Sequence, residues 1–258
     1  MAGLTVTIIT LNEEANIVAC LESVRWADEI VVVDSQSTDC TVELARAFTD
    51  RIFSVPWQGF ARNKNLALEQ ARMEWILSLD ADERVPPALQ QEILEQLQAD
   101  GPLDGYRVAR KNYFCGQWIK HLGWYPDYTI RLFRRGRGHF ADREVHEGVE
   151  VEGRVGTLQH PLEHYTYASL SDFVQRMDRY SQLAARELVK QGRRPCWGEL
   201  LWRPWATFVN LYFIKKGFLE GRAGYTLAVL YSVYNFLKYA KLRELRQQAR
   251  TLRARHEN

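Results

Sequence analysis

Residues 75–83 read WILSLDADE, a short apolar run that ends in acidic side chains. Bounded apolar runs of this length are typical of buried β-strands. Residues 4–11 (LTVTIITL) and Glu29–Asp34 (EIVVVD) have the same character. We therefore expect three buried strands, two of which end in an aspartate, Asp34 or Asp80.

Helical patterns separate these strands. The expected helices cover residues 12–24, 41–48, 60–71 and 86–98, and a short strand covers residues 51–55. Asn12 is expected to cap the first helix, with Glu13 and Glu14 in its first turn. Strands that alternate with helices at this spacing indicate a parallel α/β sheet. Because ligands of such sheets bind beyond the carboxyl ends of the strands, Asp34 and Asp80 should lie at the ligand-binding edge.

The pattern changes after about residue 100. Expected strands at residues 105–110, 129–134 and 155–159 are joined by long loops, and one loop, residues 114–127, is rich in aromatic residues. A helix is expected over residues 170–191, and the remainder reads as helical, apolar and basic. We therefore predict an α/β catalytic domain over residues 1–168 and a helical region over residues 169–258.

Composition places the chain among ordinary globular proteins. Of its 258 residues, 46% are hydrophobic and 26% are charged. The four cysteines form no Cys-x-x-Cys pair, which favours reduced thiols in a cytoplasmic protein over a zinc site or a disulfide framework. The first twelve residues carry no basic leader, so we interpret them as a strand and not as a secretory signal.

Asp80 and Asp82 are the strongest chemical signal. They follow a buried strand two residues apart, which places them on the same side. Two carboxylates this close repel each other unless a cation lies between them. Carboxylate oxygens suit Mg²⁺ or Mn²⁺, either of which would also bind a substrate diphosphate. The alternative interpretation is a solvated acidic turn before the next helix.

Two further segments carry polar groups. Asp34 ends its strand where a base or ribose could donate hydrogen bonds to it, and at least one of Ser37, Thr38 and Asp39 is expected to cap the next helix. Lys64 stands near a helix start, where it could meet a phosphate. A solvated lysine is the alternative.

The order of the motifs resembles a known family. The segments TLNEE (10–14), VVDSQSTD (32–39), KNLAL (64–68) and DADE (80–83) resemble the inverting family-2 glycosyltransferases. The segments GWYPD (123–127), RLFRR (131–135), VHEGVEVEG (145–153) and EHYTY (163–167) resemble the branch that adds glucose to the lipopolysaccharide core. The resemblance covers nearly the whole chain. It implies a GT-A fold, which is a Rossmann-like nucleotide-sugar-binding domain, here with a C-terminal helical extension.

The resemblance implies a role for individual residues. Asp34 would contact the uracil, Glu13 would lie near the nucleoside, and Lys64 would face the diphosphate. Asp80 would lie by the ribose and the metal, and Asp82 would ligate the metal. Further contacts to the nucleotide sugar are expected from Thr10, Asn12, Ser37 and Asn65.

Some roles stay open between neighbouring residues. An inverting transferase needs a carboxylate that takes the proton of the acceptor hydroxyl, and we favour Glu147 over Glu144. A late histidine often supplies a third metal ligand in this fold, so His164 is favoured and His160 competes with it. Acceptor contacts are expected from Trp124, Tyr125, Asp127 and His146, although aromatic rings also serve ordinary core packing.

The C-terminal segment is basic. Residues 203–258 hold 11 Lys and Arg against 3 Glu, a net charge of +8, so the preceding residues carry −6 of the overall +2. Two uncharged runs, residues 205–214 and 223–237, are shorter than the roughly 20 residues that span a bilayer. Tryptophans and tyrosines surround them, and Ser232, Asn235, Lys238 and Lys241 form a polar stripe. This pattern is typical of a helix in the membrane interface, and a helix packed on the protein is the alternative.

The sequence therefore predicts an inverting transferase that uses a nucleotide sugar, UDP-glucose first, with Mg²⁺ or Mn²⁺. The expected acceptor is a lipid-linked glycan, the lipopolysaccharide inner core, at the cytoplasmic face of the inner membrane. Alternatives are a polyprenyl phosphate or peptide acceptor and a non-catalytic, membrane-bound protein that senses nucleotide sugars. Nucleic-acid binding is disfavoured because the basic residues alternate with long apolar runs.

Overall fold

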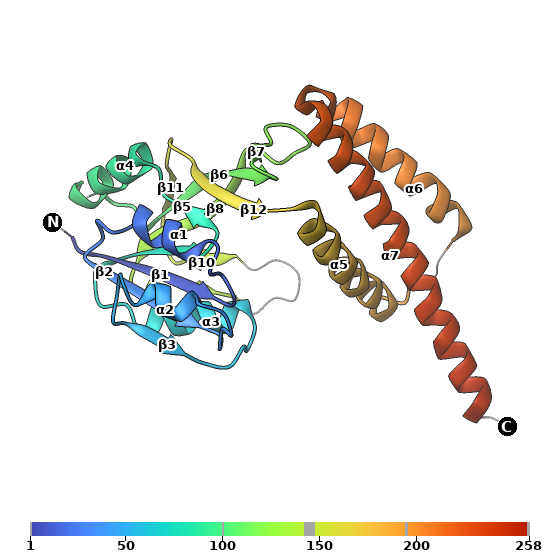
Figure 1. The fold of residues 1–258 in the computed structure, drawn as a ribbon, viewed down its shortest axis with the longest axis horizontal. Helices are drawn as coiled ribbons and strands as arrows, with labels where there is room; N and C mark the ends of the chain where they lie inside the picture. Colours follow the sequence, from blue (N-terminus) through green and yellow to red (C-terminus); the bar gives the residue numbers. More distant parts are fainter. Residues whose placement is uncertain (1, 100, 142–147, 194–195, 257–258) are drawn as a thin grey trace. The chain divides into compact units, whose positions relative to one another are not determined.

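The computed structural model describes residues 2–99, 101–141, 148–193 and 196–256, and its contacts group the chain into two units. The first unit joins Met1–Lys111 with Pro126–Tyr165, and the second joins Asn112–Tyr125 with Thr166–Asn258 (Figure 1). The boundary expected after residue 168 stays a prediction about domains. The described contacts place the aromatic segment Asn112–Tyr125 with the C-terminal helices.

Four parallel strands form one half of the sheet in the first unit. They are β1 (Leu4–Thr10), β2 (Glu29–Asp34), β3 (Ile52–Ser54) and β4 (Trp75–Asp80), in the order β3-β2-β1-β4. Every residue of β1 is buried, as the apolar run predicts. The register pairs Thr10 with Asp34 and Ile9 with Asp80. The carboxyl ends of these strands therefore meet at one edge, as expected.

Helices connect the parallel strands. They are α1 (Ile17–Ser23), α2 (Thr41–Ala45), α3 (Phe60–Glu69) and, after β4, α4 (Pro87–Gln98). The expected start of the first helix at Asn12 is wrong, because α1 begins only at Ile17. Asn12 instead adopts a left-handed backbone (φ 55°) and its side chain accepts a hydrogen bond from the amide of Thr38. Asparagine tolerates this conformation better than most residues.

The remaining strands either extend this sheet or form a separate two-stranded sheet, and the sequence pattern missed several of them. They are β5 (Glu83–Arg84), β6 (Gly105–Phe114), β7 (Gln117–Trp118), β8 (Asp127–Arg134), β9 (Gly138–Phe140), β10 (Val149–Val151), β11 (Val155–Thr157) and β12 (Leu162–Tyr167). β8 pairs antiparallel with β4, and β12 pairs antiparallel with β5. The β12–β5 pairing sets His164 opposite Glu83. A histidine late in the chain thereby reaches the acidic turn that follows β4.

The second unit is mainly helical. It contains α5 (Leu170–Lys190), α6 (Trp197–Val209), the π-helical turn η1 (Asn210–Ile214), the 3-10 turn η2 (Gly217–Glu220) and α7 (Gly221–His256). Both α5 and α6 lie against α7 (Figure 1). Their apolar core includes Phe114, Ile119, Phe173, Leu211 and Leu227. The aromatic loop and the helices therefore share one core.

The polar stripe on α7 makes contacts within this unit. The Asn235 amide donates to Thr207 of α6 at 2.9 Å, and the Lys241 ammonium donates to the Asp178 carboxylate of α5 at 2.6 Å. The Ser232 hydroxyl bonds its own helix backbone. Much of the stripe that the sequence suggested for a membrane interface is therefore used in packing helices together. Over the described part of the chain, every helix is too short or too polar to cross a bilayer.

Candidate active site

Asp34, at the end of β2, is almost fully buried and its carboxylate is hydrogen-bonded on both oxygens. Oδ1 accepts from the Ser37 hydroxyl at 2.5 Å and from the Thr10 hydroxyl at 3.2 Å, and Oδ2 accepts from the Ser37 amide at 2.9 Å. The pairing of β1 with β2 brings Thr10 and Asp34 together. Three residues that were expected to contact the nucleotide sugar thus form one cluster.

Two loops at this edge brace each other. The Asn12 amide donates to the Ser37 hydroxyl at 2.8 Å, and the Asn12 side-chain carbonyl accepts from the Thr38 amide at 2.8 Å. The Glu13 amide donates to the Thr41 hydroxyl at 2.8 Å. The loop after β1 is therefore held by the loop after β2. This arrangement fixes the rim where a base would be expected to lie.

Asp80 lies between two cations. The Lys64 ammonium, from α3, contacts Oδ1 at 2.6 Å, and the Arg131 guanidinium, from β8, contacts Oδ2 at 2.5 Å. Burial alone would raise the pKa of Asp80, but the positive charges of Arg131 and Lys64 hold that pKa well below its usual range. Asp80 is therefore ionised at neutral pH, and its charge is balanced by the protein.

Arg131 also joins Asp80 to Glu83, which is completely buried. Its guanidinium contacts Glu83 Oε1 at 2.5 Å, and Glu83 Oε2 accepts from the Asp80 amide at 3.0 Å. Burial disfavours the charge on Arg131, yet the two carboxylates raise its pKa above the ordinary value. Arg110 contributes a second cation at 3.6 Å from Glu83. These buried ion pairs thereby hold in place the turn that carries Asp80 and Asp82.

Sequence reasoning did not assign a role to Arg131 or Glu83. Arg131 stands beside buried Leu132 and Phe133, and a charged residue in a buried strand is almost always paired. That signal identifies Arg131 as partnered, but its partners come from β4 and β5. The antiparallel pairing of β8 with β4 brings Arg131 towards Asp80, and Glu83 follows on β5.

Asp82 and His164 lie side by side. Asp82 Oδ2 is 3.4 Å from His164 Nε2, and both side chains are mostly buried. His160 instead bonds Glu92, with its Nδ1 2.9 Å from Oε2. Of the two histidines left open by the sequence, His164 is the one beside the acidic turn. Its role as a ligand stays a prediction.

The donor set at this turn suits a divalent ion that also binds phosphate. Within the described ranges, no group of three or more His, Cys, Asp and Glu side chains is arranged to hold a metal by itself. Mg²⁺ is commonly bound by one or two carboxylates together with substrate phosphates and water. Asp82 and His164 would fit such a partial site, since carboxylate oxygen suits Mg²⁺ and Mn²⁺ and imidazole nitrogen is a common ligand of divalent transition-metal ions. Asp80 is less available because Lys64 and Arg131 occupy its two oxygens.

Asn65 and Asn63 form hydrogen bonds with different partners. The Asn65 amide pairs with the backbone of Phe140 in both directions, at 2.9 Å each, so it ties α3 to β9. Its expected contact with the nucleotide sugar stays a prediction. Asn63, which the sequence did not single out, is fully buried and donates to the Ser35 hydroxyl at 2.7 Å.

The expected acceptor residues fall in different parts of the chain. Asp127, in the first unit, accepts from the Arg110 guanidinium at 2.6 Å. Trp124 and Tyr125 belong to the second unit, where Trp124 packs on the apolar core and Tyr125 lies edge-on to Trp118. Glu144, His146 and Glu147 lie outside the described residues, so the catalytic base stays a prediction.

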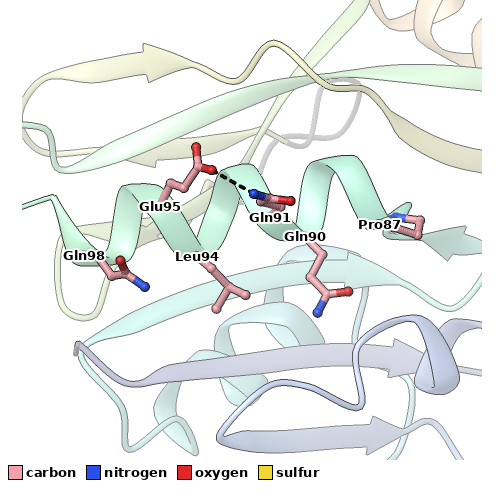
Figure 2. A pocket seen from close by; sticks show the side chains of 6 residues that line it. All are labelled: Pro87, Gln90, Gln91, Leu94, Glu95 and Gln98. Carbon is pink, nitrogen blue, oxygen red and sulfur yellow. Dashed lines mark hydrogen bonds between the residues drawn. The ribbon is translucent and has the colours of Figure 1, made fainter.

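A hollow of about 580 Å³ lies elsewhere, along the outer side of α4 (Figure 2). Its lining comes from that helix alone: Pro87, Gln90, Gln91, Leu94, Glu95 and Gln98. Gln91 donates to Glu95 across one helical turn, and none of the candidate site residues lines the hollow. We do not assign it to the active site.

Comparison with known proteins relates this chain to glycosyltransferases. The sequence model described as "Glycosyl transferase family 2" matches residues 5–148. The lipopolysaccharide core biosynthesis glycosyltransferase LpsC of Rhizobium meliloti is 37% identical over 93% of this chain and 91% of its own length. An uncharacterized glycosyltransferase of Rickettsia typhi is 30% identical over 98% of this chain and 90% of its own length.

Solved structures share the fold at low identity. The mannosyltransferase PcManGT from Pyrobaculum calidifontis, in complex with GDP-Man and Mn²⁺, has a TM-score of 0.54 and 18% identity, covering 93% of this chain and 87% of that one. S. aureus TarS 1-349 in complex with UDP-GlcNAc has a TM-score of 0.50 and 14% identity, covering 96% of this chain and 92% of that one. These likenesses confirm the predicted fold class.

Proposed function

Because the chain belongs to glycosyl transferase family 2, we propose that it transfers glucose from UDP-glucose to the inner core of lipopolysaccharide. The similarity to LpsC over nearly the full length of both chains supports this acceptor class. The observation that carries the chemistry is the meeting of Lys64, Asp80 and Arg131 with the neighbouring Asp82–His164 pair. All of them lie at or beside the carboxyl end of β4.

Binding of the donor is assigned to this edge of the sheet. The Asp34 cluster would receive the uracil, and Lys64 would turn from Asp80 towards the diphosphate. Arg131 would remain on Asp80 when Lys64 leaves, so that the aspartate stays ionised. Asp82 and His164 would hold Mg²⁺ or Mn²⁺, whose chemistry is to neutralise the charge of the leaving diphosphate. The likeness to a mannosyltransferase found with GDP-Man and Mn²⁺ supports a divalent ion.

The transfer step needs one base. An acceptor hydroxyl oxygen bonds to the anomeric carbon, the bond from that carbon to the diphosphate oxygen breaks, and the hydroxyl proton passes to a carboxylate. We assign that carboxylate to Glu147, with Glu144 second. Replacing the base by glutamine should leave donor binding intact and lower turnover by about 10²–10⁴-fold.

A lipid-linked acceptor would bring the enzyme to a membrane. We propose that the chain works at the cytoplasmic face of the inner membrane as a peripheral protein, where a lipid-linked glycan is accessible. The basic and aromatic helical unit supports this location, since such segments are attracted to anionic lipid surfaces.

A thermal-shift screen tests the donor. UDP-glucose with Mn²⁺ should raise the melting temperature more than ADP-, GDP- or CMP-sugars do, because a ligand that binds the native state stabilises it. Leaving out Mn²⁺ should remove most of the shift. A larger shift with another nucleotide sugar would overturn the donor assignment.

A transfer assay tests the acceptor. Labelled glucose should appear on lipopolysaccharide truncated in its inner core, and not on a polyprenyl phosphate or a peptide. Labelling of polyprenyl phosphate alone would replace the acceptor assignment. Donor binding without transfer to any of the three would favour the non-catalytic alternative.

A further inference from the structure

Helix α6 is apolar on two sides, although only one side is covered. Its inner side packs Phe208 beside Leu211 and Leu227, in the core of the helical unit. Its outer side carries Leu201, Trp202 and Trp205, which are 76%, 64% and 56% exposed. A helix of a globular protein ordinarily presents polar residues to water, and a helix that is apolar all round is normally buried on every side.

The exposed apolar side continues past α6. The next turns, η1 and η2, expose Phe213, Ile214, Phe218 and Leu219, and Ile214 is 71% exposed. We call the exposed side chains of α6, η1 and η2 the outer apolar face, defined by these residues: Leu201, Trp202, Trp205, Phe213, Ile214, Phe218 and Leu219. Many large apolar side chains exposed within one short segment are typical of interaction sites on soluble proteins.

Charge indicates what covers this face. Residues 200–219 contain Arg203, Lys215 and Lys216 but no acidic residue. Both lysines are exposed, and neither forms an ion pair with an acid of the described chain. A second copy docked symmetrically would bring the same cations near each other, which is unfavourable. An anionic lipid surface offers opposite charge and a boundary at which tryptophan is enriched.

We propose that the outer apolar face lies in the interface of an anionic membrane, with Lys215 and Lys216 at the lipid headgroups. The face belongs to α6, η1 and η2, whereas Asn235 and Lys241 of the α7 stripe bond to α6 and α5. The inference rests on the proposed function, which supplies a membrane-linked acceptor. It goes beyond that function by naming the surface that makes the contact.

Co-sedimentation with vesicles tests the surface. The full chain is mixed with vesicles of phosphatidylcholine and phosphatidylglycerol in equal parts at low salt. The double variant Leu201→Ser/Ile214→Ser should bind the vesicles at least about tenfold more weakly. Two large apolar side chains that would be transferred from water into the membrane are then missing. Leu183→Ser on α5 is the matched control, since Leu183 is also exposed (48%) and lies outside this face. The control should bind like the unmodified chain.

A second variant tests the role of charge without touching the apolar residues. Lys215→Glu/Lys216→Glu should reduce binding to these vesicles, and added salt should weaken the remaining binding less than it weakens binding of the unmodified chain. Equal binding by this double lysine variant and the unmodified chain would contradict the proposed headgroup contact. Melting curves check that each variant is folded.

Other results would overturn the proposal. They are failure of the unmodified chain to bind the vesicles, an equal loss in the Leu183→Ser control, or a dimer that only Leu201→Ser/Ile214→Ser converts to monomer while vesicle binding persists. The UDP-glucose thermal shift is measured on the same samples. Vesicle binding through this face without a thermal shift by UDP-glucose would support the proposed surface and refute the proposed function. A thermal shift by UDP-glucose without vesicle binding would refute the proposed surface alone.

Discussion

At the scale of the residue, Asp80 shows how a charge can be balanced from distant parts of the chain. Sequence reasoning expected Asp80 and Asp82 to need a bound cation, because the two carboxylates would otherwise repel each other. In the structure Lys64 and Arg131 already supply two positive charges to Asp80. The proposed metal site therefore depends on Asp82 and His164 more than on Asp80. The protein's own cations therefore balance Asp80, and the proposed metal ion would balance Asp82.

Removing Arg131 should destabilise the fold. Arg131→Met leaves buried Glu83 without its nearest cation, and breaking a buried ion pair from one side costs about 3–5 kcal/mol. Urea denaturation at pH 7 measures the loss. Arg135→Met is the control, because Arg135 is an exposed arginine of the same segment. An equal effect of both substitutions would mean that the network is not the cause.

The stabilities of the unmodified protein and of Arg131→Met should depend differently on pH. The pKa of Asp80 is lowered in the fold, so its ionised form stabilises the native state above the unfolded pKa of about 3.9 and this contribution is lost as the pH falls further. Without Arg131 the lowering is smaller. The stability difference between the two proteins should therefore shrink as the solution is acidified.

Asp82→Asn and His164→Gln should each remove metal-dependent donor binding while leaving the fold intact. Both side chains lie at the acidic turn, 3.4 Å apart, and each substitution removes one candidate ligand. Calorimetry with UDP-glucose and Mn²⁺ measures the affinity. His160→Gln is the control, because His160 bonds Glu92 instead. Undiminished affinity in Asp82→Asn, or a loss confined to His160→Gln, would refute the metal assignment.

At the scale of the element, Glu220 joins a helical turn to the aromatic loop. It ends η2 and is nearly fully buried. Its Oε1 accepts from the backbone amides of Lys120 and His121 at 2.9 Å each, and lies 2.6 Å from His121 Nδ1. Burial would raise the pKa of Glu220, but its hydrogen bonds to His121 and to the two amides lower it. One carboxylate thereby orders the segment that leads to Trp124 and Tyr125.

Glu220→Gln should weaken this connection. Glutamine cannot accept all these hydrogen bonds with a full negative charge, so the free energy of unfolding at pH 7 should fall by about 1–3 kcal/mol. Because the pKa of Glu220 is lowered in the fold, its contribution exists above the unfolded value of about 4.3 and is lost as the pH falls below it. Urea denaturation at pH 7 and below pH 4 measures the loss of stability and its dependence on pH. A stability difference that grows on acidification would contradict this account.

At the scale of the whole molecule, the chain combines a GT-A sheet with a helical unit that has its own core. Helices α5 and α7 bury Ala185, Tyr239 and Leu242 together. The predicted division after residue 168 implies that the chain could be cut after Gln191 with donor binding preserved. The structure changes that expectation, because α5 and the aromatic loop would lose the helices that cover them.

Truncation after Gln191 should therefore expose an apolar surface as well as abolish membrane binding. Phe173 and Met177 of α5, and Ile119 of the aromatic loop, would become accessible to water. Light scattering and binding of a hydrophobic dye should detect aggregation that Leu201→Ser/Ile214→Ser does not cause. A monomeric truncated chain that binds UDP-glucose normally would show that the helical unit is dispensable for folding.

The sequence by itself determined the parallel strands, the helices between them and the acids at their carboxyl ends. Buried strands need continuous apolar runs, and β2 and β4 span the predicted residues. The family also followed from the order of short motifs, and the comparisons confirm it. These features are local, because each depends on a few consecutive residues.

Only the tertiary structure decided which distant residues meet. Pairing of β12 with β5 brings His164, and not His160, to Asp82, and pairing of β8 with β4 brings Arg131 to Asp80. Strands such as β5 are two residues long and leave no periodic pattern to read. The polar stripe of α7 is a second example. The sequence shows which residues share a face of the helix, but only the structure shows that this face contacts other helices. Long-range contacts are chosen by packing of the whole chain, so no local pattern specifies them.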